Sequence, residues 1–314
     1  MKTITQAFRT LLVFMLIFYC VGVYAQRKEV SYFNDSVEIC PLADKELIDS
    51  CYNLLDRNMM LETDGMYGQI AVIDATTSEV LAWASLEKQL DDDCGWCGDM
   101  VYVPFKKQVC STDIFVPFIA AKCLEKSNTS LGKMVDTECG ILEVNDSLKI
   151  RDHNWRRGGY GKVTFEKALL MKSRIGMYKA FMTMPNGADL WEQAYDTIQK
   201  SNAIELAISF NQMYHQKSSL EYVKKIATDI FEKTGIQHRL APRGIKLAGI
   251  YNIRQCDDNK RSSDEFTFVG CFPADNPKYT IGMVVVRPHK LPATIGMLSK
   301  EVNLLIEWLM NRKK

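Results

Sequence analysis

Two cysteines stand at a spacing that is typical of redox and metal chemistry. Cys94-Gly-Trp-Cys97 matches a thioredoxin-type pair or half of a zinc site. No βαβ pattern surrounds the pair, and no second closely spaced Cys or His pair follows it. The acidic run Asp91-Asp92-Asp93 just before it disfavours a thiolate. We favour a local disulfide or two buried thiols, and a metal site and redox chemistry stay open.

Serine and lysine recur at a spacing that could support acyl transfer. A lysine three residues after a serine on a helix lies close enough to take the hydroxyl proton. Two strings satisfy this pattern, Ser85-x-x-Lys88 and Ser130-x-x-Lys133. Ser85 ends an expected strand and Ser130 follows an expected helix end, so neither serine opens a helix. Such strings arise readily by accident.

The N-terminus has the composition of an export signal. Lys2 and Arg9 precede an apolar run over residues 11–23, and Val23-Tyr24-Ala25 resembles a cleavage site. The run is shorter than the roughly 20 residues that span a bilayer. We expect residues 1–25 to be a cleaved signal peptide, the mature chain to reach the periplasm or cell envelope, and membrane contact only through this signal.

Composition excludes some classes of function. The 314 residues carry a formal net charge of +1, with 47% hydrophobic and 25% charged residues, which is ordinary for a globular protein. Without a basic field, nucleic-acid binding is set aside. An oxidising compartment favours disulfides, and an odd count leaves at least one thiol free, with a connectivity that cannot be deduced. The nine cysteines beyond the signal are Cys40, Cys51, Cys94, Cys97, Cys110, Cys123, Cys139, Cys256 and Cys271.

Hydrophobic periodicity places these residues on a sheet and a set of helices. The stretch 266–286 predicts a hairpin, with Pro273 to Pro277 as its turn and a Val run covered on both faces. Gly270 and Gly282 predict close backbone approach. Further strands are expected within 68–85 and at 247–255, and a polar loop over 86–110. Helices are expected over 41–62, 117–125, 163–184 (with Thr164 as its cap), 203–214 and 295–310.

Both hairpins resemble those of a known family. FVGCFPADNPKYTIGMVVV, which ends at Val286, looks like the late hairpin of penicillin-binding protein transpeptidase domains, whose fold is shared with serine β-lactamases. GQIAVIDATTSEVLAWAS at 68–85 resembles the opening hairpin of that domain. The helices at 163–184 and 203–214 are similar to those of its helical subdomain. The resemblance covers roughly residues 65–310.

The resemblance implies an α+β architecture. We expect an antiparallel sheet of about five strands flanked by helices, together with an all-helical subdomain. The transpeptidase-like domain would span residues 26–314. Its sheet subdomain would comprise 41–110 and 245–314, and its helical subdomain about 111–244.

Family members acylate a serine by means of three motifs, and the first of them is altered here. It reads Ser-x-x-Lys within Pro-Gly-Ser-Thr-Phe-Lys-Pro-Phe. Aligning its Pro-Phe with Pro117-Phe118 puts Asp113 at the nucleophile and Val116 at the lysine. Valine accepts no proton. Sliding the frame to Ser111 leaves Ile114 at the lysine position.

The other two motifs are altered as well. Ser-x-Asn falls on Lys172-Ser173-Arg174, and Lys-Thr-Gly falls on Ile250-Tyr251-Asn252. Intact copies elsewhere lie in the wrong context: Ser209-x-Asn211 is inside an expected helix, and Lys233-Thr234-Gly235 is at an expected helix C-terminus.

The resemblance places Lys172, Arg174, Asp113 and Tyr251 around one cleft. Two cations there could hold a carboxylate or another anion. Alternatively, these residues neutralise each other in a filled groove. The four histidines are scattered and read as surface or capping residues, so we expect neither a metal nor a cofactor.

The functional expectation is a protein of peptidoglycan metabolism that has lost its acylation machinery. It would bind a peptidoglycan stem peptide or a cell-envelope protein. One alternative is an active serine D,D-transpeptidase or carboxypeptidase with relocated catalytic residues. A second is a thiol-disulfide protein that uses Cys94 and Cys97.

Overall fold

The computed structural model describes residues 44–90, 98–103, 110–145, 148–196, 200–215, 221–258, 261–289 and 294–312. They belong to one compact unit, Ile39–Lys314. The expected signal peptide (residues 1–25) and the pair Cys94 and Cys97 lie outside the described residues. No described helix is both long and apolar enough to cross a membrane.

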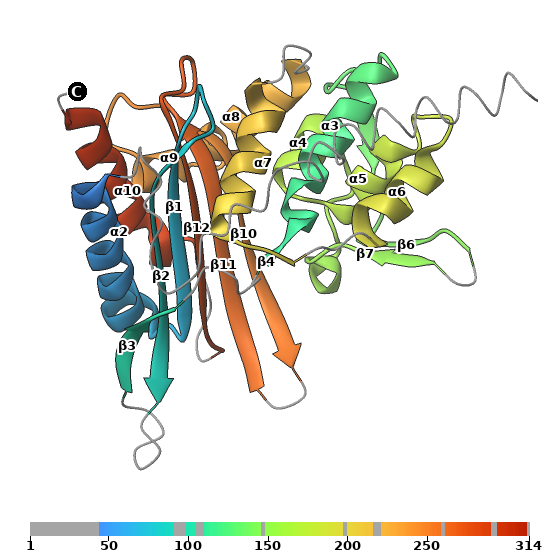
Figure 1. Cartoon of the computed structure of the whole chain (residues 1–314). Coiled ribbons are helices and arrows are strands. Elements are labelled where there is room, and N and C mark those ends of the chain that lie inside the picture. The colour runs from blue at the N-terminus through green and yellow to red at the C-terminus, as the bar shows by residue number, and fades with distance from the viewer. Residues whose placement is uncertain are drawn as a thin grey trace, which may run out of the picture. The chain divides into compact units, whose positions relative to one another are not determined.

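A six-stranded antiparallel sheet joins the two ends of this unit (Figure 1). The strand order is β10-β11-β12-β1-β2-β3, and β1 pairs with β12 from Tyr67↔Val286 to Asp74↔Tyr279. The expected hairpins therefore lie side by side in one sheet. The strands are β1 (Tyr67–Asp74), β2 (Val80–Leu90), β3 (Gly98–Tyr102), β10 (Ala248–Asp258), β11 (Arg261–Phe272) and β12 (Tyr279–Pro288).

Helices cover both faces of the sheet (Figure 1). On one face α2 (Lys45–Arg57) packs on β1 and β2, continues as the π-helix η1 (Asn58–Thr63), and lies beside α10 (Gly296–Asn311). On the other face α7 (Ala203–His215) packs on β1, β11 and β12. Successive valines Val284 and Val285 are both fully buried because the sheet is covered on both sides.

The expected close approach at Gly282 is confirmed. A Cβ at this position would clash with the backbone oxygen of Ala203, where α7 begins. The glycine therefore lets α7 lie directly on β12. At Gly270 the approach is looser, since a Cβ would lie 3.1 Å from the Ala248 oxygen.

The middle of the chain forms helices with short strand pairs between them. The helices are α3 (Val116–Lys126), α4 (Phe165–Leu170), α5 (Arg174–Phe181), α6 (Gly187–Asp196), α8 (Glu221–Glu232) and α9 (Gln237–Leu240), with 3₁₀ turns η2 (Thr112–Phe115) and η3 (Trp155–Arg157). The pairs are β4 (Cys110–Ser111) with β9 (Lys200–Ser201), β5 (Met134–Asp136) with β8 (Lys162–Thr164), and β6 (Ile141–Glu143) with β7 (Lys149–Arg151). The expected all-helical subdomain thus also contains strands, and α7, inside its expected range, packs on the sheet.

Two local expectations were wrong. Part of the expected polar loop 86–110 is strand, because β2 runs to Leu90 and pairs with β3, which gives the sheet its sixth strand. The expected single helix 163–184 is two helices, α4 and α5, interrupted at Met171 to Ser173. The expected cap of α4 is confirmed, since the Thr164 side chain accepts a hydrogen bond from the Lys167 N–H.

Glu301 of α10 is expected to lower the stability of this fold at neutral pH. It is 1% exposed; its Oε2 accepts from Asn58 Nδ2 at 2.8 Å, while its Oε1 is buried without a hydrogen-bond partner among the described residues. Burial, with Glu62 nearby, raises the pKa of Glu301. Glu301→Gln should therefore raise the free energy of unfolding at pH 7 by about 1 kcal/mol.

The pH dependence of this gain distinguishes the charge from other effects. A carboxyl whose pKa is raised in the folded state stabilises that state at low pH and loses this contribution as pH rises. The gain from Glu301→Gln should therefore shrink as pH falls through the carboxyl range in urea unfolding. Glu307→Gln, at an exposed position of the same helix, should show no such trend. A loss of stability at pH 7 that equals the loss at pH 4 would contradict this assignment.

Candidate functional site

Two of the three segments aligned with family motifs meet at the outer strand β10. The third segment, Ile250-Tyr251-Asn252, is part of this strand, and the first begins on η2, which packs against it. Strand β10 ends the described sheet, so one of its sides faces the helical part of the chain. The η2 turn and helix α8 both pack against it, and α3 packs against α5. The second segment, the break between α4 and α5, contacts β10 through Lys172.

The first segment places an apolar side chain where the family lysine would stand. Asp113 is half-buried on η2, and Val116 is the first residue of α3, with 1% exposure. Pro117 follows in the first turn, where the missing N–H leaves no bond unmade. An isopropyl group packed into the core can neither take nor return a proton.

The second segment is a helix end closed by a lysine in a glycine-type conformation. Lys172 has φ +53°, its N–H donates to the Leu169 oxygen, and the Ser173 N–H donates to the Ala168 oxygen. This is the Schellman pattern, in which glycine is the usual residue. A side chain there costs about 1 kcal/mol or more. A strained lysine in a tight turn points to a role for its side chain.

The next residues fix that turn from the other side. Ser173 caps α5 by accepting from the Gly176 N–H at 3.0 Å and donates to Asp152 Oδ2 at 2.8 Å. The Ile175 N–H donates to Asp152 Oδ1 at 3.1 Å. Ser173 and Asp152 are both fully or nearly buried. Neither residue was predicted to shape the site, because the Ser-x-x-Gly pattern at Ser173 is a weak capping signal and nothing near Asp152 in the sequence marks it.

The third segment supplies a backbone acceptor and an aromatic ring. Ile250 is fully buried opposite Val269, and Tyr251 and Asn252 are half-buried. The ring of Phe231 in α8 lies 6.3 Å from that of Tyr251, centroid to centroid. Burial raises the pKa of the Tyr251 phenol. Tyr251 is therefore neutral and held against α8.

Lys172 connects the α4–α5 turn to β10, the place where the resemblance implies a groove. Its Nζ donates to the backbone oxygen of Tyr251 and lies 3.9 Å from the centroid of the Tyr251 ring, a cation–π geometry. The residue as a whole is partly exposed, but burial of the amine lowers the pKa of Lys172 to about 7. The amine therefore changes charge near neutral pH.

The remaining aligned residues do not share this contact. Arg174, the first residue of α5, is exposed. Asp113 lies on η2, which packs against β10. The structure thus joins Lys172 to Tyr251 and leaves Arg174 at the surface beside them.

The two intact serine-lysine strings lie in structural settings that differ from that of the family motif. Ser85 is buried in β2, and Lys88 pairs with Asp64 at 3.1 Å. Ser130 and Lys133 lie in an exposed turn, where Ser130 Oγ accepts from the Gly132 N–H.

The intact copies of the other two motifs are likewise engaged. Asn211 is buried in α7 and bonds to the Ala75 oxygen at 2.9 Å. Lys233, just beyond α8, pairs with Glu166 at 2.8 Å and with Asp229 at 3.0 Å.

Four cysteines whose side chains the structure describes are free thiols. Cys51, Cys123 and Cys271 are buried and Cys139 is exposed. Burial raises the pKa of all three buried thiols, that of Cys123 to about 11. These three are packing residues with little thiolate character.

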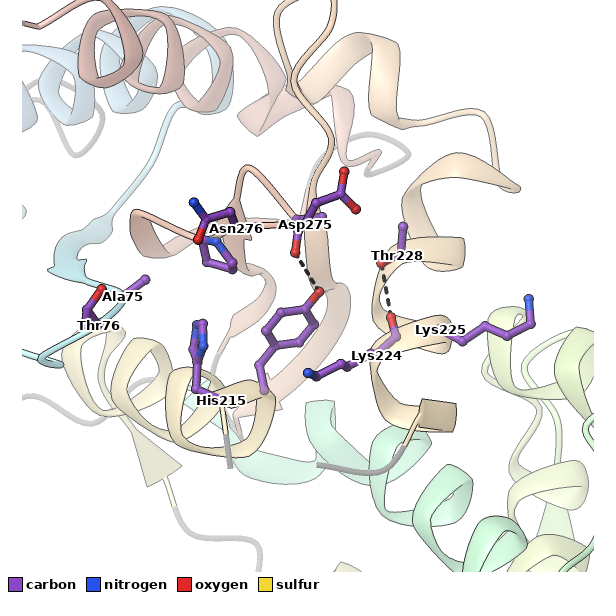
Figure 2. Close-up of a pocket in the computed structure, with 11 residues that line it drawn as sticks. Ala75, Thr76, His215, Lys224, Lys225, Thr228, Asp275 and Asn276 are labelled. Atoms are coloured by element: carbon purple, nitrogen blue, oxygen red, sulfur yellow. Dashed lines mark hydrogen bonds between the residues drawn. The ribbon is translucent and has the colours of Figure 1, made fainter. Parts of the chain in front are cut away.

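A cavity of about 710 Å³ lies apart from the aligned segments (Figure 2). The turn after β1, the end of α7, helix α8 and the turn before β12 form it. The Nζ atom of Lys224 lies 5.9 Å from the centroid of the Tyr214 ring. Figure 2 shows Lys225 pointing away from the cavity, and this lysine pairs with Glu166 and Asp229. Burial and Lys224 lower the pKa of His215 in its wall. None of the aligned site residues lines this cavity, so we do not assign it as the site.

The histidines stand apart from one another. His153 bonds to Tyr160 Oη at 2.7 Å, His215 lines the cavity, His238 lies in α9, and His289 Nδ1 lies 2.7 Å from Asp264 Oδ1. Among the residues that the structure describes, no three His, Cys, Asp or Glu side chains cluster as a metal site would require.

Comparisons with known proteins agree with this architecture. No family model matches the sequence, and no curated protein matches it. The apo transpeptidase domain of penicillin-binding protein 3 from Burkholderia pseudomallei matches with a TM-score of 0.61 and 17% identity, over 84% of this chain and 93% of that one.

Two further solved structures match similarly. A peptidoglycan glycosyltransferase from Burkholderia ambifaria has a TM-score of 0.61 and 17% identity, over 85% of this chain and 96% of that one. A peptidoglycan synthetase from Bifidobacterium adolescentis has a TM-score of 0.62 and 12% identity, over 85% of this chain and 60% of that one. The chain has the fold of penicillin-binding protein transpeptidase domains.

Proposed function

We propose that this chain is an exported, non-acylating relative of the transpeptidase domains, which acts in peptidoglycan metabolism by binding. The observation that carries the proposal is the Lys172 bridge: its amine sits on the Tyr251 carbonyl at the strand edge. Export rests on the signal-like residues 1–25, and the link to peptidoglycan rests on the proteins that share the fold.

Acyl transfer to a serine needs a hydroxyl and a base within hydrogen-bonding reach. Val116 stands at the position aligned with the base, and Asp113 at that of the nucleophile. Losing the base alone lowers the rate by roughly 10²–10⁴-fold. Of the intact serine-lysine strings, Lys88 is paired with Asp64 and Ser130 caps a turn. A binding role therefore fits these residues better than relocated catalysis.

The groove beside β10 is suited to a peptide that carries a carboxylate. In the protonated state Lys172 supplies a cation at the strand edge. Charge-assisted bonds of this kind are stronger than neutral ones. A peptidoglycan stem peptide has the required free carboxylates, and binding would exchange the Tyr251 oxygen for a carboxylate as the partner of Lys172.

Labelling with a fluorescent penicillin tests the loss of acylation. We expect no covalent band after denaturing electrophoresis under conditions in which an active penicillin-binding protein is fully labelled. A band that one Ser→Ala substitution removes, whether at Ser85, Ser111 or Ser130, would replace this proposal with relocated catalysis.

Calorimetry with a synthetic stem pentapeptide tests the binding itself. We expect binding that is stronger at pH 6 than at pH 8, because the Lys172 amine is protonated below its pKa of about 7. Absence of binding at both pH values would leave the fold without this ligand and would contradict the proposal.

The thiol-disulfide alternative concerns Cys94 and Cys97, outside the described residues, and free-thiol counting before and after mild reduction tests it.

A further inference from the structure

A compact group of arginines surrounds Trp155 on the turn between β7 and β8. The Cζ atoms of Arg151 and Arg156 lie 5.3 Å and 5.2 Å from the centroid of the Trp155 ring. Arg157 follows directly, and all three arginines are exposed. We call these four residues the Arg-Trp surface. The hairpin β6–β7, which leads into it, lies at the far end of the helical part from the large sheet (Figure 1).

The three guanidinium groups are not neutralised by nearby carboxylates. Asp152, the adjacent acid, is buried and accepts from Ser173 and Ile175. Glu143 on the neighbouring strand pairs with Lys149. Within the described ranges none of the three arginines forms an ion pair. Three cations within seven residues repel one another, and since they form no ion pair with the described residues, an external anion would relieve this repulsion.

The turn that carries these side chains is well fixed. The Arg157 N–H donates to the Asn154 oxygen at 2.8 Å, and the Trp155 N–H donates to the Asp152 oxygen at 3.1 Å. Gly159 lies so close to Gly140 that an added Cβ would clash with its backbone. Arginine forks held on a rigid turn and stacked on a ring lose little entropy when they bind.

We propose that the Arg-Trp surface is a docking site for a short acidic peptide segment of a partner protein, two or three carboxylates in length. Planar guanidinium groups bind carboxylates in a bidentate manner. The Trp155 ring holds the two arginines and so positions their forks.

Other anionic partners fit this surface less well. A nucleic acid or an anionic membrane is attracted by a field of many cations, whereas the whole chain has a formal net charge of +1. Three cations on one turn match a short cluster of carboxylates in size. The inference concerns a surface separate from the Lys172 groove and does not depend on the function proposed for it.

Fluorescence anisotropy with a labelled Gly-Glu-Asp-Glu-Gly peptide, which carries three side-chain carboxylates, tests the proposal at low salt. The variant Arg151→Gln/Arg156→Gln/Arg157→Gln is expected to weaken binding at least tenfold. The matched control Arg239→Gln/Arg243→Gln/Arg254→Gln removes the same charge from three other exposed arginines and should weaken binding less than twofold. The single change Arg157→Gln, expected to weaken binding about threefold, serves if the triple variant does not fold.

Each further outcome supports or overturns the assignment. Equal losses in the two triple variants would show attraction by net charge alone and would overturn it. So would tighter binding, through the same arginines, of a single-stranded oligonucleotide or of phosphatidylglycerol vesicles than of the peptide. Retention of peptide binding in Lys172→Met would keep this surface distinct from the groove, so that either proposal can fail without the other.

Discussion

Lys172→Met is expected to stabilise the protein at pH 6 by roughly 2–4 kcal/mol in chemical unfolding, and the gain is expected to vanish toward pH 10.5. The folded state lowers the pKa of this amine to about 7, so the unfolded chain holds the proton more tightly. A base with a depressed pKa therefore destabilises the fold fully below pH 7. This penalty disappears as pH rises to the ordinary lysine value. Methionine is similar in length to the aliphatic part of lysine. It cannot make the hydrogen bond to the Tyr251 oxygen, and this loss sets the lower end of the expected range of roughly 2–4 kcal/mol.

The matched control for this variant is Lys133→Met. Lys133 is exposed in the turn after α3, and its substitution should leave the pH dependence of unfolding as in the parent protein. A Lys172→Met variant that is destabilised equally at pH 6 and pH 10 would show that the bond to Tyr251 outweighs the burial of the charge. In that case the Lys172 side chain would stabilise the strained αL turn. The proposal that a change in the charge of Lys172 controls ligand binding would then be contradicted.

An amine that destabilises its own fold is a common mark of a binding site. Two features of Lys172 lower the free energy of unfolding: its backbone φ of +53° and its buried ammonium group. An anionic ligand that replaced the Tyr251 oxygen would remove part of this penalty. Ligand binding should then raise the stability most where the amine is charged.

The sheet was predictable because its strands carry their own signals. The valines that end β12 and the Pro-Ala-Asp-Asn-Pro turn define the late hairpin from local chemistry. Strand β3 was missed because its apolar run, Met100-Val101-Tyr102, is only three residues long and follows Gly98-Asp99, a pair that is unfavourable in strands. Its pairing with β2 is made by backbone groups, and amino-acid composition does not predict such pairing.

The helix break was not predictable, for a tertiary reason. Residues 171–173 contain neither glycine nor proline, so local propensity favours continuation through Lys172. Asp152 provides the carboxylate that receives the Ser173 hydroxyl and the Ile175 N–H, and it lies about twenty residues earlier in the chain. Only the folded arrangement brings these groups together.

The proximity of Lys172 to Tyr251 was predictable, but the kind of contact between them was not. Alignment to the family motifs placed Lys172 and Tyr251 in one cleft, and the two residues do meet. That the amine bonds to a backbone oxygen could not be read from side-chain types. The exposure of Arg174 could not be predicted either, because it depends on the orientation of α5, whose N-cap is Ser173.

Asp152→Ala is expected to destabilise the protein by about 3 kcal/mol, measured by urea unfolding at pH 7. The side chain is 1% exposed and accepts two hydrogen bonds at the start of α5, where the helix dipole favours a negative charge. Alanine would leave the Ile175 N–H and the Ser173 hydroxyl buried and unpaired. Asp152→Asn keeps an acceptor for Ile175 and should lose about half as much. Asp136→Ala, which removes a turn cap on the Glu138 N–H at the surface, should lose less than about 1 kcal/mol.

The same substitution also tests whether Asp152 positions Lys172. If Asp152 holds the α4–α5 turn in place, its loss should free the Lys172 amine to reach water. The stability of Asp152→Ala should then rise less between pH 7 and pH 10 than that of the parent protein, and adding Lys172→Met should change it little. An unchanged pH dependence in Asp152→Ala would show that the Schellman turn and the Tyr251 ring seat the amine on their own, and Asp152 would be a helix cap without influence on the groove.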